Sequence, residues 1–156
     1  MQAWDLQELR TGQLLTTDEF MVQPADLAAH VESSFLGEVI GCGEECLSSA
    51  GSAERGDAGW GRICPVAVVI GRAIAALAGT LTGLRIEVGK VARVSARAPA
   101  IVGEPLSAQA RVRFARRSGP GLTCVTLEVA VRRRQGEVLR FELAIEARAA
   151  AGRDAA

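Results

Sequence analysis

The sequence contains no tyrosine, and aromatic residues make up only 4% of its 156 residues. Proteins that bind single-stranded nucleic acids use aromatic side chains as stacking platforms, and these are scarce here. The 18 basic residues are balanced by 18 acidic ones, so no net charge attracts nucleic acid or an anionic membrane. These shortages argue against nucleic acid and against a membrane as partners of this chain.

Metal-ligand spacings are also missing. The four cysteines follow no repeated C-x-x-C spacing, and His30 offers the only imidazole, so we predict neither a metal nor a cofactor. Nothing in Met1–Arg10 resembles a secretory leader, which favours reduced thiols in a cytoplasmic protein. The longest apolar run, Pro65–Leu84, is interrupted by Arg72 and is short of a membrane span. It is more typical of a buried helix.

Two segments carry helical signals. Pro24 and Asp26 suit the first turn of a helix, and apolar residues follow at helical spacing as far as Phe35. The second segment, Val66–Gly79, is apolar around nearly its whole circumference. We therefore expect it to be surrounded on most sides, with small residues such as Gly71 letting the backbone of a sheet approach closely.

Most of the sequence after this helix alternates between apolar and polar residues. The alternation predicts four long strands, each with one buried face, and their apolar residues lie in Leu84–Ala96, Leu106–Phe114, Val125–Val131 and Leu139–Ile145. Val88, Val94 and Phe114 are expected on the buried faces, and Gly89 is expected to mark a bulge. Short connections rich in glycine and proline predict an antiparallel meander.

An apolar helix and a curled antiparallel sheet fit together if the sheet wraps the helix. This is the hot-dog fold, an α+β architecture. A flat sheet with the helix on one face would need a polar stripe on the helix, and Arg72 alone does not make one. We predict one hot-dog domain over residues 13–149, an N-terminal extension at 1–12 and a flexible tail at 150–156.

Three stretches resemble the MaoC-like branch of hot-dog proteins, which includes dehydratases and (R)-specific enoyl-CoA hydratases. FMVQPADLAAHVESSF (Phe20–Phe35) is similar to the opening strand and helix of that family, and APAIVGEPL (Ala98–Leu106) to its P-V-x-x-G-D-T-L motif. VTLEVAVRRRQGE (Val125–Glu137) is similar to its v-x-v-x-v-x-N-Q-x-G-E strand and turn. The resemblance implies a β-hydroxyacyl or enoyl thioester as substrate, in polyketide or other secondary metabolism.

The chain departs from the catalytic motif of that family, G-D-x-N-P-x-H. Glu38 stands at the position of the motif's Asp, but Gly43 stands where its His should be, and the His-Gly that often opens the central helix is Cys64-Pro65. The resemblance therefore implies a divergent member without the usual Asp/His dyad. An altered site of this kind could isomerise or cyclise its substrate instead.

Two residues are candidates for acid–base catalysis. His30 is the one side chain that titrates near neutrality without perturbation; it could be catalytic or could form an exposed pair with Asp26, one helical turn away. Glu38 could be the base of the altered site or an ordinary surface carboxylate.

Four residues are candidates for substrate binding. The backbone N–H groups of Val66 and Ala67 at the start of the central helix could polarise a thioester carbonyl, although Pro65 could simply begin a helix. Trp60 could be a pocket wall or a core anchor, and Cys64 could line the pocket or fill the core as a small apolar residue.

Three functions remain open from the sequence. The first is a MaoC-like hydro-lyase, and its alternatives are a non-catalytic acyl-binding subunit of a hetero-oligomer and a hot-dog thioesterase. Coenzyme A or an acyl carrier protein enters only as the carrier of the substrate, and Arg116–Arg117 and Arg132–Arg134 could bind either carrier or form a solvated edge. We expect a homodimer or heterodimer, because a single curled sheet leaves unpaired edge strands.

Overall fold

The structure is a computed structural model that describes residues 9–33, 63–81, 84–119 and 122–149. Within these ranges lie two helices and one five-stranded antiparallel sheet. In chain order the elements are β1 (Leu14–Thr16), α1 (Pro24–Ser33), α4 (Val66–Thr80), β2 (Leu84–Ala96), β3 (Ser107–Gly119), β4 (Leu122–Arg133) and β5 (Gly136–Ala149). Both predicted helices and all four predicted long strands are present.

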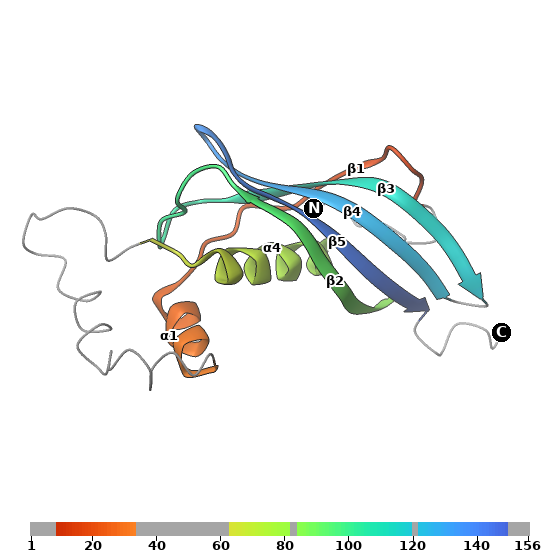
Figure 1. Cartoon of the computed structure of the whole chain (residues 1–156), viewed down its shortest axis with the longest axis horizontal. Helices are drawn as coiled ribbons and strands as arrows, with labels where there is room; N and C mark the ends of the chain where they lie inside the picture. The colour runs from red at the N-terminus through yellow and green to blue at the C-terminus, as the bar shows by residue number, and fades with distance from the viewer. Residues whose placement is uncertain (1–8, 34–62, 82–83, 120–121, 150–156) are drawn as a thin grey trace, which may run out of the picture.

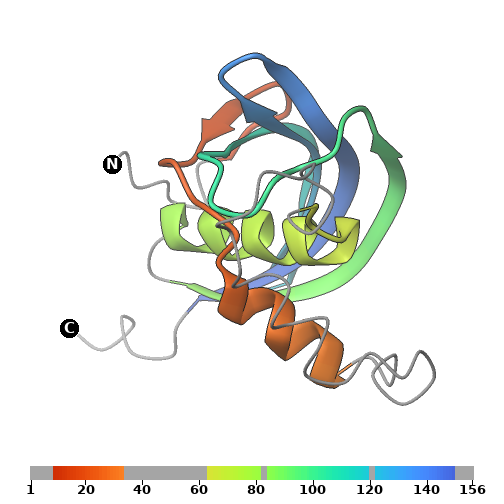
Figure 2. The same ribbon diagram turned by 90° about the vertical axis from the view of Figure 1, so that its left-hand side faces the viewer.

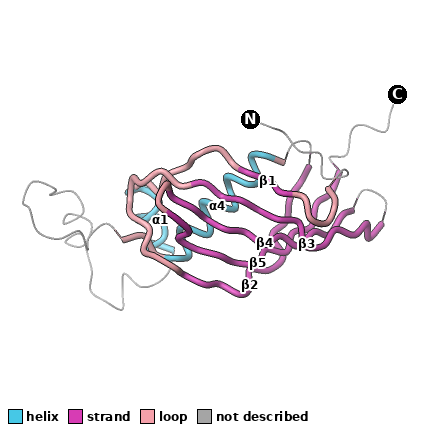
Figure 3. Tube along the Cα trace, turned by 90° about the horizontal axis from the view of Figure 1, so that it is seen from above, coloured by secondary structure: helices cyan, strands magenta, loops and turns pink. Residues whose placement is uncertain are grey.

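The strands are ordered β1-β3-β4-β5-β2, and each pairs with its neighbours in antiparallel fashion. The expected meander is correct for β3, β4 and β5 but wrong for β2, which pairs with β5 rather than with β3. The segment from Arg97 to Leu106 instead crosses the end of the sheet to reach β3, which lies on the far side of β4 and β5 (Figure 1; Figure 3). Gly103, with φ of +78°, makes a turn inside this crossover rather than the tip of a hairpin.

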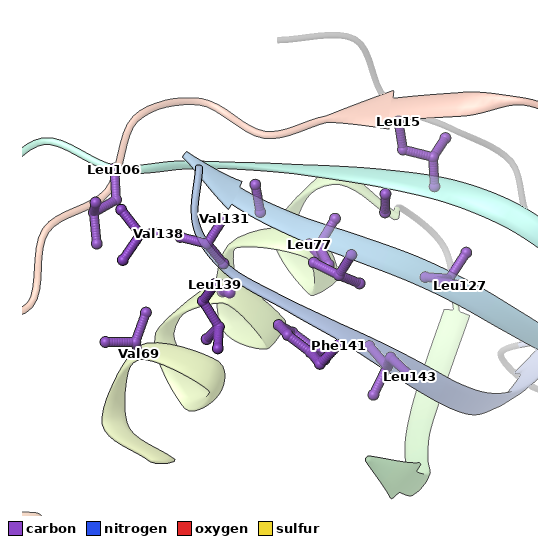
Figure 4. Packing of buried hydrophobic residues seen from close by; sticks show 14 of the residues in the cluster. Leu15, Val69, Leu77, Leu106, Leu127, Val131, Val138, Leu139, Phe141 and Leu143 are labelled. Carbon is purple, nitrogen blue, oxygen red and sulfur yellow. The ribbon is translucent and has the colours of Figure 1, made fainter. Parts of the chain in front are cut away.

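The sheet curls over α4, as the sequence predicts, and α1 lies on the side of α4 away from the sheet (Figure 1; Figure 2). Inward side chains of β5 such as Leu139 and Phe141 are directed towards α4, which contributes Val69 and Leu77 to the same core (Figure 4). Neither described helix is long and apolar enough to cross a membrane.

Most of α4 beyond its first turn is buried or half-buried, as expected, and one stripe of small residues (Gly71, Ala75 and Gly79) is exposed. Val69, Ala73, Leu77 and Thr80 form the buried face that meets the sheet, and Val68 is buried on a different side of the helix. The two glycines of α4 face away from the sheet: no described atom lies within 4 Å of a Cβ atom added at Gly71 or Gly79. Because the larger side chains bury more apolar area, they occupy the face that packs against the sheet.

Two residues of β2 that the alternation assigns to a buried face are exposed. The predicted bulge at Gly89 is confirmed, since Val88 pairs with Ile145 and Lys90 with Ala144. A second irregularity follows between Ala92 and Ser95, where Arg93 has φ of 51°. Val88 and Val94 are 50% and 47% exposed, because β2 is an edge strand with a neighbour on one side only.

Phe114 is 52% exposed, which contradicts its predicted place on the buried face of β3. The register slips between Val112 and Phe114, where one extra residue is inserted in β3. A one-residue insertion reverses the alternation that follows it, so Ala115 rather than Phe114 packs against the core.

The chain before α1 runs along β3. Thr17 Oγ1 accepts a hydrogen bond of 2.9 Å from the N–H of Ala108, and the Gly12 N–H donates to the carbonyl of Val112 at 2.8 Å. Leu9, within the segment that the sequence assigns to an N-terminal extension, is part of the core. These contacts fix the position from which α1 begins.

The two phenylalanines of the sheet provide a matched test of the reversed alternation. We expect Phe141→Ala to lower the free energy of unfolding by about 3–5 kcal/mol, because Phe141 is 1% exposed and its loss leaves a cavity. The same change at Phe114 should cost no more than about 0.5 kcal/mol. Urea denaturation measures both, and equal losses would contradict the assigned register of β3.

Candidate functional site

A cavity of about 300 Å³ opens where α4 begins. Its walls are mainly apolar and come from three segments that are distant in sequence: the approach to α4 and its first turn (Ile63, Cys64, Val66, Val69), the end of β2 and the crossover (Ala96–Ala100), and the start of β5 (Val138, Leu139). An apolar cavity with a few polar groups is the usual form of a small-molecule site.

Backbone hydrogen bonds hold these three segments together. The Cys64 N–H donates to the carbonyl of Ala100 at 2.8 Å, which joins the approach to α4 to the crossover. The Arg97 N–H donates to the carbonyl of Val138 at 2.8 Å, which joins the crossover to β5. The cavity walls are therefore fixed by the backbone rather than by side-chain contacts alone.

The first turn of α4 presents free donors at this cavity. Pro65 caps the helix without a side-chain hydrogen bond, and the N–H groups of Val68 and Val69 donate to its carbonyl at 3.0 and 3.2 Å. The remaining first-turn N–H groups, those of Val66 and Ala67, have no recorded acceptor among the described residues. Val66 lines the cavity, whereas Ala67 is exposed beside it and is not a lining residue. Such donors, at the positive end of a helix, favour a partial negative charge.

Cys64 lies in the cavity wall and is 4% exposed. Burial raises the pKa of its thiol to about 11, and the carboxylates of Glu104 and Asp26 contribute to the same shift. The thiolate is the nucleophilic form of cysteine, so Cys64 does not supply a nucleophile near neutral pH. It serves as a small apolar wall.

Glu104 and Asp26 are neighbours of this site that sequence reasoning did not single out as functional. Glu104 accepts a hydrogen bond of 3.3 Å from the Ile101 N–H, and its other oxygen lies 3.4 Å from Arg133. The sequence did carry a signal for Glu104, since the P-V-x-x-G-D-T-L motif has an acid at the matching position.

Asp26 joins α1 to α4. Its Oδ2 lies 3.5 Å from Arg72 Nε and accepts a hydrogen bond of 2.8 Å from the Gln23 N–H. The sequence identified Asp26 as a helix-start residue, which is correct, but could not show that it also contacts the central helix. It is half-buried rather than on an exposed face.

The remaining predicted residues are not brought together here. His30 lies on α1, one turn beyond Asp26, and is not among the described residues that line the cavity. Glu38 and Trp60 lie outside the described residues. The catalytic roles of His30 and Glu38 and the binding role of Trp60 therefore stay predictions from the sequence.

A second cavity, of about 330 Å³, lies further along α4, between Asp18–Phe20 and the segment from Arg72 to Thr80. It does not include the first turn of α4. Its charged residues carry both signs, and Arg72 is paired with Asp26. The cavity at the helix start is therefore the better candidate for a site that stabilises developing negative charge.

The raised pKa of Cys64 makes stability depend on pH in one direction. The unfolded thiol ionises near its ordinary value of 9.0 and the folded thiol near 11, so the stabilisation is complete below pH 9 and is lost as the pH rises towards 11. We expect the free energy of unfolding to fall by about 1 kcal/mol more in the wild type than in Cys64→Ala between about pH 8 and about pH 10. Denaturant titrations at several pH values measure this difference, and parallel curves for the two proteins would contradict the assignment.

Comparison with known proteins gives matches in structure only. The sequence matches no protein-family model and no curated protein sequence. A MaoC-like dehydratase from Rhodospirillum rubrum superposes with a TM-score of 0.62 at 18% identity, over 93% of this chain and 97% of that one. An unliganded (R)-hydratase from Pseudomonas aeruginosa gives a TM-score of 0.62 at 17% identity, over 93% and 86% of the two chains.

A third similar structure is a Mycobacterium tuberculosis protein with a double hotdog fold. It gives a TM-score of 0.64 at 14% identity, and the match covers 99% of this chain but 47% of that longer chain. Likeness at these identities shows the fold alone. The strand order, the enclosed helix and these superpositions together show that the chain has the α+β hot-dog fold that its sequence predicts.

Proposed function

We propose that this chain is a hydro-lyase of the MaoC-like type that interconverts an enoyl thioester and a β-hydroxyacyl thioester. The observation that carries the proposal is the position of the apolar cavity at the first turn of α4. An acyl chain requires apolar walls, and its thioester carbonyl requires hydrogen-bond donors beside those walls. The resemblance in sequence and the two similar structures described as a dehydratase and an (R)-hydratase favour the same chemistry.

In the hydration direction, the N–H groups of Val66 and Ala67 would polarise the thioester carbonyl. A base takes a proton from water, the water oxygen bonds to the β-carbon, and the electron pair of the double bond moves to form an enolate. Negative charge on the carbonyl oxygen is then stabilised by the helix start. Proton transfer to the α-carbon completes the reaction, and dehydration is the reverse sequence.

We assign the proton transfers to Glu38 and His30, as the sequence predicts. Among the described lining residues, the titratable side chains are Cys64 and Arg97. Cys64 stays protonated near neutral pH, and an arginine does not give up its proton in a protein. The acid–base groups must therefore come from outside the described walls.

The same geometry also serves the alternatives. Isomerisation and cyclisation pass through a similar enolate, and a thioesterase would use the same N–H groups to stabilise an oxyanion at the carbonyl carbon. A non-catalytic acyl-binding subunit is favoured by one observation, the lack of an acid–base pair among the described lining residues. We keep polyketide or other secondary metabolism as the proposed setting and the cytoplasm as the proposed location.

Turnover should depend on the N–H group of Val66. Pro65 has ψ of 139°, an extended conformation that tolerates a following proline, and proline suits the first helical position. Val66→Pro therefore removes one donor without breaking α4, and we expect kcat to fall about 100-fold. Val66→Ala, which keeps the donor and shortens the side chain, is the matched control and should retain most of the activity.

The assay is mass spectrometry of crotonyl and 3-hydroxyacyl thioesters, with Glu38→Gln and His30→Ala measured alongside. If the wild type adds or removes one water and either variant does not, the result supports the hydro-lyase and the assignment of its acid–base pair. An intact, bound thioester identifies the acyl-binding subunit instead. Cleavage of the thioester identifies a thioesterase.

We also propose that two copies of the chain pair through β2. This strand is one edge of the described sheet and is far longer than β1, the other edge. Glu87 of β2 lies opposite Glu146 of β5, so its neighbour within the sheet carries the same charge. An antiparallel copy related by a twofold axis near Gly89 would bring the partner's Lys90 beside it.

Charge reversal tests this arrangement. We expect Lys90→Glu to raise the dissociation constant of the dimer about tenfold, because it places the new glutamate of one copy beside Glu87 of the other. Adding Glu87→Lys to the same chain should restore the dimer, because the pairs are again opposite in charge. Sedimentation equilibrium measures the dissociation constant, and a double variant as weak as the single one would contradict this pairing.

A further inference from the structure

The cavity end of the sheet carries more arginine than its carboxylates can neutralise. This end consists of the crossover and the β4–β5 hairpin, which lie at the same end of the sheet as the start of α4 (Figure 1). Its charged residues are Arg97, Arg132, Arg133, Arg134 and Arg140 against Glu104 and Glu137. Glu128, further along β4, also accepts a hydrogen bond of 2.9 Å from Arg140. Like charges gathered in this way repel one another until an anion binds.

Two of the arginines already have carboxylate partners. Arg133 Nη1 lies 3.4 Å from Glu104 Oε1. Arg140 donates hydrogen bonds to both oxygens of Glu137, and these bonds are the main reason why the pKa of Glu137 lies below its usual value. Both glutamates at this end are therefore occupied.

The other three arginines are incompletely neutralised. Arg97 reaches Glu137 only at 3.9 Å, and its side chain is 62% exposed. Arg132 donates to the neutral amide of Gln109 at 3.4 Å. Arg134, in the turn between β4 and β5, has no recorded hydrogen bond or ion pair with another described residue.

The backbone places these arginines at the same end of the sheet as the cavity. Arg97 is itself a lining residue, and its N–H donates to the carbonyl of Val138, a second lining residue. Arg132 pairs in register with Glu137, the residue before Val138. Arg134 lies in the turn that directly follows β4.

We infer that Arg97, Arg132 and Arg134 form a surface that binds the phosphate of a phosphopantetheine arm. The inference rests on the proposed thioester substrate. In such a substrate the phosphate is separated from the thioester by two amide units, so it can bind outside the cavity while the acyl group lies inside. Guanidinium groups match the oxygens of a phosphate in geometry and charge. Coenzyme A and an acyl carrier protein present this same phosphate.

The second arginine cluster of the sequence lies in the wrong place for this role. Arg116 and Arg117 pair with Cys124 and Thr123, at the opposite end of β3 and β4 from the hairpin (Figure 1). They carry a similar charge but lie far along the sheet from the cavity. They therefore provide a matched control for the effect of position.

The test compares an Arg132→Gln, Arg134→Gln double variant with an Arg116→Gln, Arg117→Gln double variant. Substrates are crotonyl-CoA, crotonyl-phosphopantetheine and crotonyl-pantetheine, which lacks the phosphate. For the Arg132→Gln, Arg134→Gln variant we expect kcat/KM to fall about tenfold with crotonyl-CoA and crotonyl-phosphopantetheine. Its kcat/KM with crotonyl-pantetheine should not change. The control variant should match the wild type on all three.

The outcomes separate this inference from the proposed function. Equal losses on all three substrates, or equal losses in both variants, would overturn the phosphate surface while leaving the hydro-lyase in place. If the wild type turns over none of the substrates, the proposed function fails, and calorimetric binding of coenzyme A and of phosphopantetheine to the same variants still decides the inference. A loss for crotonyl-CoA alone would assign the arginines to its nucleotide phosphates and overturn recognition of the arm.

Discussion

Burial of one face of α4 against the concave side of the sheet is the contact on which the other elements depend. The sheet is a single layer, and residues such as Leu127, Phe141 and Leu143 would face water on that side without the helix. Their burial determines where α4 lies, and the position of α4 determines where its first turn lies relative to the end of the sheet. A helix that only touched the rim of the sheet would leave this apolar face exposed.

The candidate site follows from that packing because the start of the helix lies at the end of the sheet. There the crossover has to pass from β2 to β3, and its carbonyl at Ala100 accepts the hydrogen bond from Cys64 as the chain approaches α4. The first-turn N–H groups that have no acceptor among the described residues therefore lie beside apolar walls that other segments supply. The buried thiol in this wall stays protonated near neutral pH, so Cys64 adds no negative charge next to the positive end of the helix.

The sequence predicts burial well in strands that have a paired strand on each side. In β4, alternate residues from Val125 to Val131 are buried as their pattern requires, because β3 and β5 flank the strand. The pattern fails at Phe114, since nothing in the residue types reveals that β3 gains an extra residue there. It also fails for α4, because an all-round apolar sequence cannot show which of its faces meets the sheet.

The site was harder to predict than the fold. The helix start and Cys64 could be found from proline position and motif alignment, and both contribute to the cavity wall or its rim. Glu104 and Asp26 were missed as neighbours of the site, because a turn motif and a helix-start motif already accounted for them. Their proximity to Cys64 arises only when the crossover and α1 both lie next to the approach to α4.

The outward face of α4, where no described atom lies within 4 Å of a Cβ atom added at Gly71 or Gly79, has a consequence for how far the sequence of this fold can change. Packing constrains one face of the helix and every second residue of the flanked strands, and it leaves the remaining positions free to change without cost to the core. Substitutions can therefore accumulate at those positions while the architecture persists. This explains how an identity of 17–18% coexists with superposition over nine-tenths of the chain.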